Sequence, residues 1–209
     1  MNEVLIKDLG QNIDYLQAWE KMLNFTTSRT DSAKNEIWVL EHPPVYTLGQ
    51  AGKPEHILNP KNIPVVKTDR GGQVTYHGPG QIVIYLLLNI RQLDINIKQF
   101  VCALEQSTIN LLKDFDINAH RIDGAPGIYV DDKKICSIGL RVKKGCTYHG
   151  IAFNTDMDLS PFKGINPCGY KDLEVTQFSE LCKAEKVNID NIKNLLVKKI
   201  TTELNLIAI

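Results

Sequence analysis

The stretch Arg70-Gly-Gly-Gln-Val-Thr-Tyr-His-Gly-Pro-Gly-Gln81, followed at once by Ile82-Val-Ile-Tyr-Leu-Leu-Leu88, sets the pattern of this sequence. Its four glycines and one proline mark bends, because glycine adopts positive φ and lets a backbone come close to a ligand. The β-branched and aromatic residues between them favour extended strands. We therefore predict a strand, a glycine turn and a second strand, with Arg70 and His77 displayed at the two bends. A turn alone needs neither an arginine nor a histidine, so the two residues indicate a ligand site.

Outward from this stretch, apolar residues recur with helical or strand periodicity. On the N-terminal side we predict a helix over residues 14–28 and strands at 37–40, 45–48 and 64–67. On the C-terminal side we predict a helix over 97–115, a hairpin of strands 128–130 and 135–142, a strand at 147–154, and helices near 176–183 and 190–204. The longest irregular segment is 155–172, and such loops are usually functional or disordered. Strands and helices do not alternate regularly, which predicts a mixed α/β (α+β) sheet domain and argues against a doubly wound fold.

Length and composition are those of a globular protein. The 209 residues suffice for one substantial core, so we expect a single domain over residues 1–209. Basic and acidic residues balance at 24 each, which leaves no field to attract nucleic acid or an anionic membrane. Five cysteines without a secretory start indicate a reducing compartment, and the longest apolar run is too short to span a bilayer. We expect a cytoplasmic protein with neither a nucleic-acid nor a membrane partner.

The cysteines occur in different settings. Cys102 lies within the second predicted helix, where we expect an inert core residue. Cys146 and His149 have C-x-x-H spacing, but no second ligand pair accompanies them, so no metal site is predicted. Cys168 lies between a proline and a glycine in the long irregular segment, where a thiol can reach solvent and substrate. It is the candidate nucleophile, with a chance loop cysteine as the alternative.

A thiol reacts at neutral pH only with help, because the thiolate is the nucleophile. The cations and bases that could help are Lys134, His77, His149 and Arg70. Lys134 leaves the predicted hairpin turn and enters an apolar strand, where partial desolvation would lower its pKa and make it a proton acceptor. The alternatives are a solvated turn lysine and histidines with satisfied structural roles, and the residues alone leave all of them open.

Several cofactor motifs are missing from the sequence. There is no G-x-x-x-x-G-K-[ST], the glycines at 78 and 80 lack the third glycine of G-x-G-x-x-G, and neither H-E-x-x-H nor C-x-x-C occurs. Nothing therefore indicates a nucleoside triphosphate, a dinucleotide or a metal. A group transfer without a cofactor fits what remains.

Five segments of the chain occur in the order seen in the lipoyl(octanoyl) transferase family. They are Glu41-His-Pro-Pro-Val-Tyr-Thr-Leu-Gly49, Arg70–Gln81, Lys134-Ile-Cys-Ser-Ile-Gly139, His149-Gly-Ile-Ala-Phe-Asn154 and Pro167-Cys-Gly169. The resemblance implies the α/β catalytic domain shared with biotin and lipoate protein ligases. It also implies octanoyl-[acyl carrier protein]:protein N-octanoyltransferase activity, the first step of endogenous protein lipoylation. The donor would be octanoyl-acyl carrier protein. The acceptors would be lysines in lipoyl domains of 2-oxoacid dehydrogenase complexes and in glycine cleavage H protein, with no cofactor.

The same resemblance assigns roles to residues. Cys168 would form a thioester acyl-enzyme, with Lys134 as its acid–base partner. The acyl site would be lined by Arg70, Gly71, Gly72, Gln73, Val74, Thr75, Tyr76, His77, Ser137, Ile138, Gly139, Gly150, Ile151 and Ala152. Cys136 stands where the family usually has alanine, so a second thiol close to Lys134 would compete for acylation or oxidation.

The chemistry implied by the resemblance is physically consistent. Backbone amides of the loop around Cys168 would stabilise the tetrahedral oxyanion. Burying an octanoyl tail at ~0.8 kcal/mol per methylene would supply roughly 5 kcal/mol of binding. The Gly71-Gly72 bend and the strand 82–88 would form the walls of this acyl site.

Two other functions compete with the transferase. An ATP-dependent lipoate or biotin protein ligase would form an adenylate and would not need Cys168. Those ligases usually carry an acidic residue after the histidine, where this chain has His77-Gly78. A non-catalytic module that binds acyl groups or lipoyl domains is the second competitor, and only the retained pair of Lys134 and Cys168 argues against it.

Overall fold

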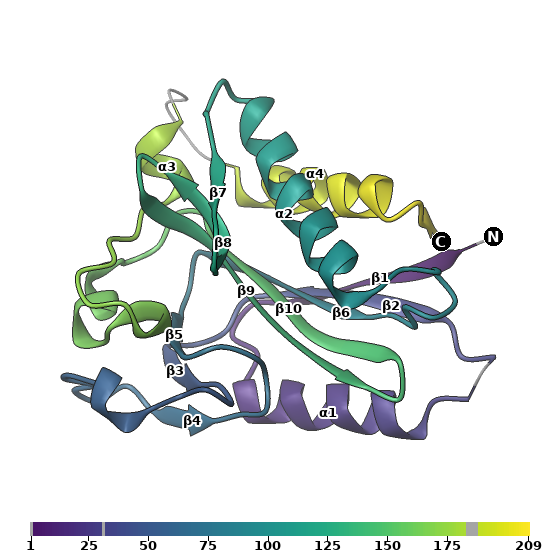
Figure 1. Ribbon diagram of the computed structural model, residues 1–209, viewed down its shortest axis with the longest axis horizontal. Helices are drawn as coiled ribbons and strands as arrows, with labels where there is room; N and C mark the ends of the chain where they lie inside the picture. Colours follow the sequence, from purple (N-terminus) through teal and green to yellow (C-terminus); the bar gives the residue numbers. More distant parts are fainter. Residues whose placement is uncertain (1, 31, 183–187) are drawn as a thin grey trace.

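A computed structural model describes residues 2–30, 32–182 and 188–209, and its centre is a large mixed sheet (Figure 1). The strand order is β11-β1-β2-β6-β10-β9-β8-β7. β1 pairs in parallel with β2 and β11, and the remaining neighbours are antiparallel. The bounds are β1 Glu3–Gly10, β2 Asn35–Leu40, β6 Gln81–Leu87, β7 His120–Ile122, β8 Ala125–Val130, β9 Lys133–Lys143, β10 Cys146–Asn154 and β11 Ile207–Ala208.

A small second sheet lies at the end of the molecule away from both termini (Figure 1). Its strands are β4 (Val65–Lys67), β3 (Val45–Leu48) and β5 (Val74–His77) in that order. The predicted strand, turn and strand around Gly78 and Gly80 are present, but they join two different sheets, since β5 belongs to the small sheet and β6 to the large one. A Cβ at Gly80 would lie 1.9 Å from the Asp156 carbonyl oxygen, and its φ is +81°, so this bend requires glycine.

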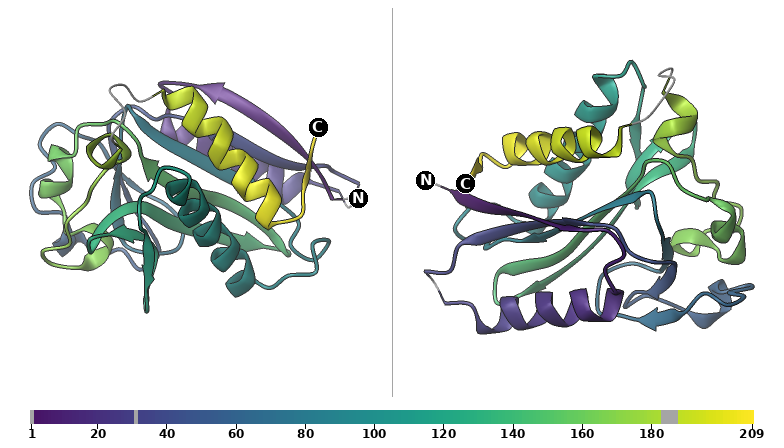
Figure 2. Two further views of the ribbon diagram at one scale, coloured as in Figure 1. Left: turned by 90° about the horizontal axis from the view of Figure 1, so that it is seen from above. Right: turned by 180° about the vertical axis from the view of Figure 1, so that it is seen from behind.

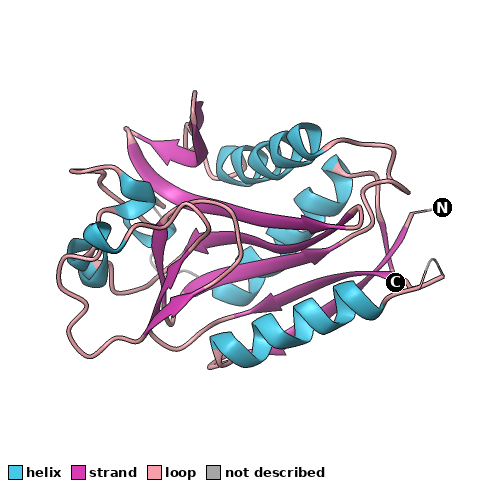
Figure 3. Ribbon diagram, turned by 60° about the horizontal axis from the view of Figure 1, so that its bottom comes forward, coloured by secondary structure: helices cyan, strands magenta, loops and turns pink. Residues whose placement is uncertain are grey.

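Helices cover both faces of the large sheet. α1 (Tyr15–Ser28) lies across one face, as Figure 3 shows, and α2 (Ile97–Lys113) and α4 (Ile189–Glu203) lie side by side on the other (Figure 2). Three 3₁₀ turns, η1 (Pro54–His56), η2 (Ser160–Gly164) and η3 (Pro167–Gly169), and the short α3 (Phe178–Leu181) belong to the irregular end. No helix among the described residues is long and apolar enough to cross a membrane.

Strand β6 shows why its sequence is a continuous apolar run. Successive side chains of a strand point to opposite faces. Ile82, Ile84 and Leu86 pack with α2 and α4, whereas Val83, Tyr85 and Leu87 pack with α1. Because both faces are covered, every residue of β6 is buried.

The mixed α/β (α+β) prediction is confirmed, and most predicted elements are found within a few residues of their expected bounds. Strands β1, β7 and β11 were not predicted, because the partly exposed residues of β1 and the exposed residues of β7 and β11 give no clear apolar alternation. Of the helix expected near 176–183, the described part is helical only at Phe178–Leu181, and residue 183 lies outside the described residues. Cys102 is exposed and not part of the core. Residues two positions apart lie on nearly opposite sides of an α-helix, and Leu104, two positions after Cys102, faces the core.

Candidate active site

A thiol and an amine from distant parts of the chain meet beside the large sheet. The Lys134 ammonium nitrogen Nζ lies 3.0 Å from Cys168 Sγ and also donates a hydrogen bond to the Pro126 carbonyl oxygen, at 3.0 Å. Lys134 is only 2% exposed, and its Nζ lies 5.0 Å from the centre of the Tyr129 ring. The pair therefore couples a buried amine to a half-buried thiol.

The turn η3 fixes the thiol in an uncommon backbone conformation. Cys168 has φ 55° and ψ 13°, in the left-handed region that costs energy for a residue with a side chain. The following Gly169 also has positive φ, at which it has no such cost. The amides of Gly169 and Tyr170 donate to the carbonyls of Asn166 and Pro167. Those two loop amides are engaged within the turn, which differs from the oxyanion role expected of them.

The backbone of Lys134 is tied to the segment that follows the Cys168 loop. Its amide donates to the Glu174 carbonyl at 2.9 Å, and its own carbonyl accepts from the Thr176 amide at 3.0 Å. Across the ladder, a Cβ at Gly127 would lie 3.2 Å from Lys134 Nζ and 2.5 Å from the Cys136 carbonyl oxygen. Because Gly127 has no side chain, there is space beside it for the Lys134 amine.

The charge state of Lys134 differs from the sequence-based expectation. Burial is the largest influence and lowers the pKa of Lys134, as expected, but Cys168 and Tyr129 act against it and leave the pKa raised above its usual value. Lys134 is therefore an ammonium ion at neutral pH. This ammonium ion lies within hydrogen-bonding distance of the Cys168 sulfur, where it can serve as a proton donor.

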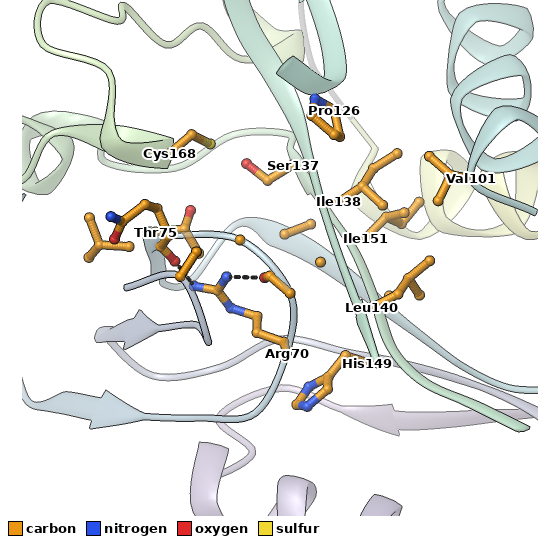
Figure 4. A pocket seen from close by; sticks show the side chains of 18 of the residues that line it. Arg70, Thr75, Val101, Pro126, Ser137, Ile138, Leu140, His149, Ile151 and Cys168 are labelled. Carbon is orange, nitrogen blue, oxygen red and sulfur yellow. Dashed lines mark hydrogen bonds between the residues drawn. The ribbon is translucent and has the colours of Figure 1, made fainter. Parts of the chain in front are cut away.

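A cavity of about 440 Å³ opens beside Cys168, as Figure 4 shows, and Lys134 also lines it. All but one of the predicted acyl-site residues line it together with Cys168 and Lys134: Arg70, Gly71, Gly72, Gln73, Val74, Thr75, His77, Ser137, Ile138, Gly139, Gly150, Ile151 and Ala152. The structure thus brings three stretches of β5, β9 and β10, with the glycine bend before β5, around one space.

Tyr76 is the exception among the predicted lining residues. Its ring packs against Tyr46 and Phe162, at centroid distances of 5.5 and 5.4 Å, in the apolar cluster under the irregular end. In β5 it alternates with Thr75 and His77, which do line the cavity. Tyr76 therefore does not line the cavity, because its ring packs on the face of β5 opposite to Thr75 and His77.

Arg70 forms the polar wall of the cavity. Its guanidinium donates to the Thr47 hydroxyl, to the Thr47 carbonyl at 2.6 Å, and to the carbonyls of Gly71 and Gln73. Arg70 is 7% exposed, and these bonds fold the Gly71-Gly72 bend around its side chain. A Cβ at Gly139 would lie 3.1 Å from Arg70 Cδ, so β9 also approaches the arginine closely.

The two candidate histidines bond elsewhere and do not touch the thiol. His77 Nδ1 lies 2.7 Å from Gln81 Oε1, which accepts, so Nδ1 carries the proton and Nε2 faces the Thr47 hydroxyl. Burial lowers the pKa of His77 well below its usual value, which keeps the ring neutral. His149 Nε2 lies 2.9 Å from Asp69 Oδ1, while burial lowers the pKa of His149. Both rings line the cavity as fixed neutral groups.

Cys136 is isolated from the cavity. It is 0% exposed, packs in the core beside α2, and contacts the Thr108 hydroxyl at 3.9 Å. Burial raises the pKa of the Cys136 thiol to about 12. The expected competition between Cys136 and Cys168 is therefore not supported by the structure, because an uncharged, enclosed thiol is a poor nucleophile.

The sequence did not indicate several further lining residues. They are Tyr15 of α1, Ile97 and Val101 of α2, Leu140 of β9, Ala51, Tyr170 and the turn at Gly124–Pro126. Val83 and Tyr85 of β6 also line the cavity, where a wall from the strand 82–88 was expected. Ile97 and Val101 belong to the helix predicted over residues 97–115, and apolar periodicity cannot distinguish a core side chain from one that borders a cavity.

The family model described as lipoyl protein ligase A/B catalytic domain matches residues 14–201. An octanoyltransferase of Nitrosomonas europaea is 53% identical over 200 residues, which cover 96% of this chain and 95% of that protein. An octanoyltransferase of Dechloromonas aromatica is 59% identical over 173 residues, which cover 83% of this chain and 84% of that protein.

Two solved structures are similar in fold. A lipoate-protein ligase A bound with ATP matches with a TM-score of 0.74 at 15% identity, over 100% of this chain and 89% of that one. A biotin protein ligase from Aquifex aeolicus matches with a TM-score of 0.57 at 13% identity, over 98% of this chain and 70% of that one. At such identities the likeness shows the fold alone.

Proposed function

The chain belongs to the lipoyl protein ligase A/B catalytic-domain family and is an octanoyltransferase, and we propose that it carries the octanoyl group on Cys168 as a thioester. The donor is octanoyl-acyl carrier protein, and the acceptor is a lysine of a lipoyl domain in a 2-oxoacid dehydrogenase complex or in glycine cleavage H protein. The observation that supports this proposal is the 3.0 Å contact of Lys134 Nζ with Cys168 Sγ beside an apolar cavity.

In the first half-reaction the Cys168 thiolate attacks the carbonyl carbon of the donor thioester. The tetrahedral intermediate collapses by breaking the bond to the carrier's sulfur. The leaving thiolate takes a proton from the Lys134 ammonium and departs as a thiol. The products are an octanoyl thioester on Cys168, a carrier thiol and a neutral Lys134 amine. One thioester replaces another of similar energy, so no further energy source enters this step.

The amides of Gly169 and Tyr170 in η3 are already hydrogen-bonded within the turn, so other groups must donate hydrogen bonds to the transient oxyanion. The Ser137 hydroxyl, which Figure 4 shows turned toward Cys168, makes no hydrogen bond to any described residue. The Lys134 ammonium has three N–H donors, of which two face Pro126 and Cys168. The third N–H of Lys134 and the Ser137 hydroxyl are the groups we assign to the oxyanion.

In the second half-reaction Lys134 changes from acid to base. Once Cys168 is acylated its sulfur carries no charge, so one of the influences that raise the Lys134 pKa disappears and burial, which lowers it, has more weight. The neutral Lys134 amine takes a proton from the attacking acceptor lysine as the amide bond forms. Cys168 leaves as a thiolate, and the ion pair of the free enzyme is restored. Amide formation from a thioester is downhill, so ATP is not consumed.

The wall residues supply binding energy and orientation. The apolar side chains of Val83, Ile138 and Ile151 face the tail, which gains ~0.8 kcal/mol for each buried methylene. Thr75 and Arg70 keep the opposite wall polar.

The experiment that tests this function is single-turnover octanoylation without nucleotide. We expect purified protein mixed with octanoyl-acyl carrier protein to gain one octanoyl mass, and to lose it to an added lipoyl domain. A requirement for ATP, with an adenylate intermediate and no adduct, would favour the ligase alternative. A protein that binds the lipoyl domain but transfers nothing would support the non-catalytic module.

A further inference from the structure

The cavity has a reactive side and an aliphatic side. The side with Cys168 and Lys134 is also lined by polar Gln73, Thr75 and Ser137. Away from them the lining consists of Ile138, Leu140, Ile151 and, from helix α2, Ile97 and Val101. Figure 4 places Cys168 and Val101 at opposite sides of this space, with Ser137 and then Ile138 and Ile151 between them.

Helix α2 presents two neighbouring apolar stripes. Phe100, Leu104 and Leu111 are fully buried in the core against the large sheet. Ile97 and Val101, one turn apart on the adjoining stripe, also line the cavity, yet Ile97 is 41% exposed and Val101 is only half-buried. An apolar side chain that borders a cavity without being enclosed by its own protein gains burial when a ligand covers it.

We propose that Val101 sets the length of the acyl chain that the enzyme accepts. This inference rests on the proposed function, because it requires the acyl group to be attached at Cys168 with its tail along Ile138 and Ile151. The tail then runs from the sulfur toward α2, and its terminal methyl contacts the Val101 side chain. Chains that are shorter lose that contact, and longer chains collide with the helix.

The position of Val101 allows it to affect the preferred acyl-chain length without disturbing the sheet. Ile138 and Ile151 belong to β9 and β10, which pair with each other and carry the core, so their replacement would disturb the sheet. Val101 is on a helix and only half-buried, so its volume can change with little loss of packing. A substitution at Val101 leaves Lys134 and Cys168 unchanged, so the chemistry of the acyl transfer stays the same.

The test is a competition among donors. Saturated acyl groups of 4 to 12 carbons on the same acyl carrier protein are mixed in equal amounts with each protein, and intact mass gives the acyl-enzyme distribution. We expect the wild type to prefer eight carbons. Val101→Phe should shift the preference to shorter chains and reduce eight relative to six carbons by about tenfold. Val101→Ala should raise nine relative to eight carbons by about fourfold, the factor that corresponds to one buried methylene.

The control places the same change elsewhere. Val142 lies near the end of β9, is 37% exposed and does not line the cavity, so Val142→Phe should leave the distribution unchanged. Thermal melting of each variant checks folding, and Val101→Ala, which only removes atoms, decides the matter if Val101→Phe does not fold. An unaltered distribution in both Val101 variants, with normal wild-type acylation, would overturn the assignment of Val101 alone. Absence of acylation of the wild type by every donor would instead overturn the proposed function.

Discussion

Lys134 Nζ and Cys168 Sγ lie 3.0 Å apart although 34 positions separate them in the chain. The contact is held by backbone bonds, since Lys134 pairs with both Glu174 and Thr176 after the Cys168 loop. The amine is further fixed by the Pro126 carbonyl. The nucleophile and its proton carrier are therefore positioned before any substrate binds, which is the form of preorganisation that acid–base catalysis needs.

Removing the amine should slow acylation with little effect on donor binding. For Lys134→Ala we expect the single-turnover rate of acyl-enzyme formation to fall by about 10² to 10⁴, the range for a lost general acid–base group. The half-saturating donor concentration should change little. Lys133→Ala is the matched control, because Lys133 is exposed and pairs with Glu174 on the surface. Equal rates in Lys134→Ala and wild type would remove Lys134 from the mechanism.

The change of Lys134 from acid to base predicts a particular pH profile. In isolated acyl-enzyme, transfer requires both a neutral acceptor amine and a neutral Lys134. The logarithm of the single-turnover rate should rise with pH at a slope near two, and then near one above the Lys134 pKa. That break should fall below the usual lysine value of about 10.4, because burial lowers the pKa and the thiolate is gone.

The same profile measured on acylated Lys134→Ala should have a slope near one throughout, since only the acceptor amine then titrates. A wild-type slope of one over the whole range would contradict the base role of Lys134 in the second half-reaction.

Cys136 should not compete with Cys168 in spite of its place two residues after Lys134. Its thiol is enclosed, and burial raises its pKa to about 12, so at pH 8 almost none of it is thiolate. In a limited reaction with iodoacetamide, peptide mapping should find alkylation at Cys168 and none at Cys136. Cys136→Ala should retain the wild-type rate of octanoylation. An octanoyl group on Cys136 in the Cys168→Ser variant would show that the core opens to the donor.

Buried His42 predicts a loss of stability in mild acid. The Ile13 carbonyl accepts from Nδ1–H, and Nε2 accepts from the Tyr85 hydroxyl, so the ring is bound as the neutral form. Burial lowers the pKa of His42 from 6.5 to about 4. The contribution of neutral His42 to the free energy of unfolding is complete above pH 6.5, where His42 is neutral in the unfolded chain as well. This contribution is lost as the pH falls through about 4. It amounts to roughly 3 kcal/mol.

Two measurements check this prediction. The free energy of unfolding from urea titrations should decline between pH 6.5 and 4, and His42→Gln should show a smaller decline. Nuclear magnetic resonance should find the His42 ring neutral at pH 5. A ring that titrates near 6.5 in the folded protein would contradict the prediction.

The sequence was most informative where a periodic pattern or a required glycine specifies the structure. The apolar run of β6 and the bends beside Gly72 and Gly80 were predicted from the chemistry of single residues, and so were the helices α1 and α2. The short edge strand β7 was missed because its three residues are exposed, and β11 was missed because it pairs with β1 at the other end of the chain. Local propensity carries no information about such partners.

The site was predicted as a set of stretches, but its geometry was not. Tyr76 was grouped with its neighbours in sequence, whereas strand alternation separates it from the cavity. The pKa of Lys134 was expected to fall with burial, but the sign depends on the distance to Cys168, which only the fold supplies. Val101 was missed because a helix face gives no sign of whether it meets the core or a cavity.

The central claim, that the octanoyl group is carried on Cys168, is tested most directly by mass. Wild-type protein is mixed with octanoyl-acyl carrier protein without nucleotide, and the adduct is located by peptide mapping, with Cys168→Ser beside it. We predict one octanoyl group on the peptide containing Cys168 and its transfer to a lipoyl domain on addition. Octanoyl transfer that proceeds at the wild-type rate in Cys168→Ser, or an adduct on another residue, would contradict the account.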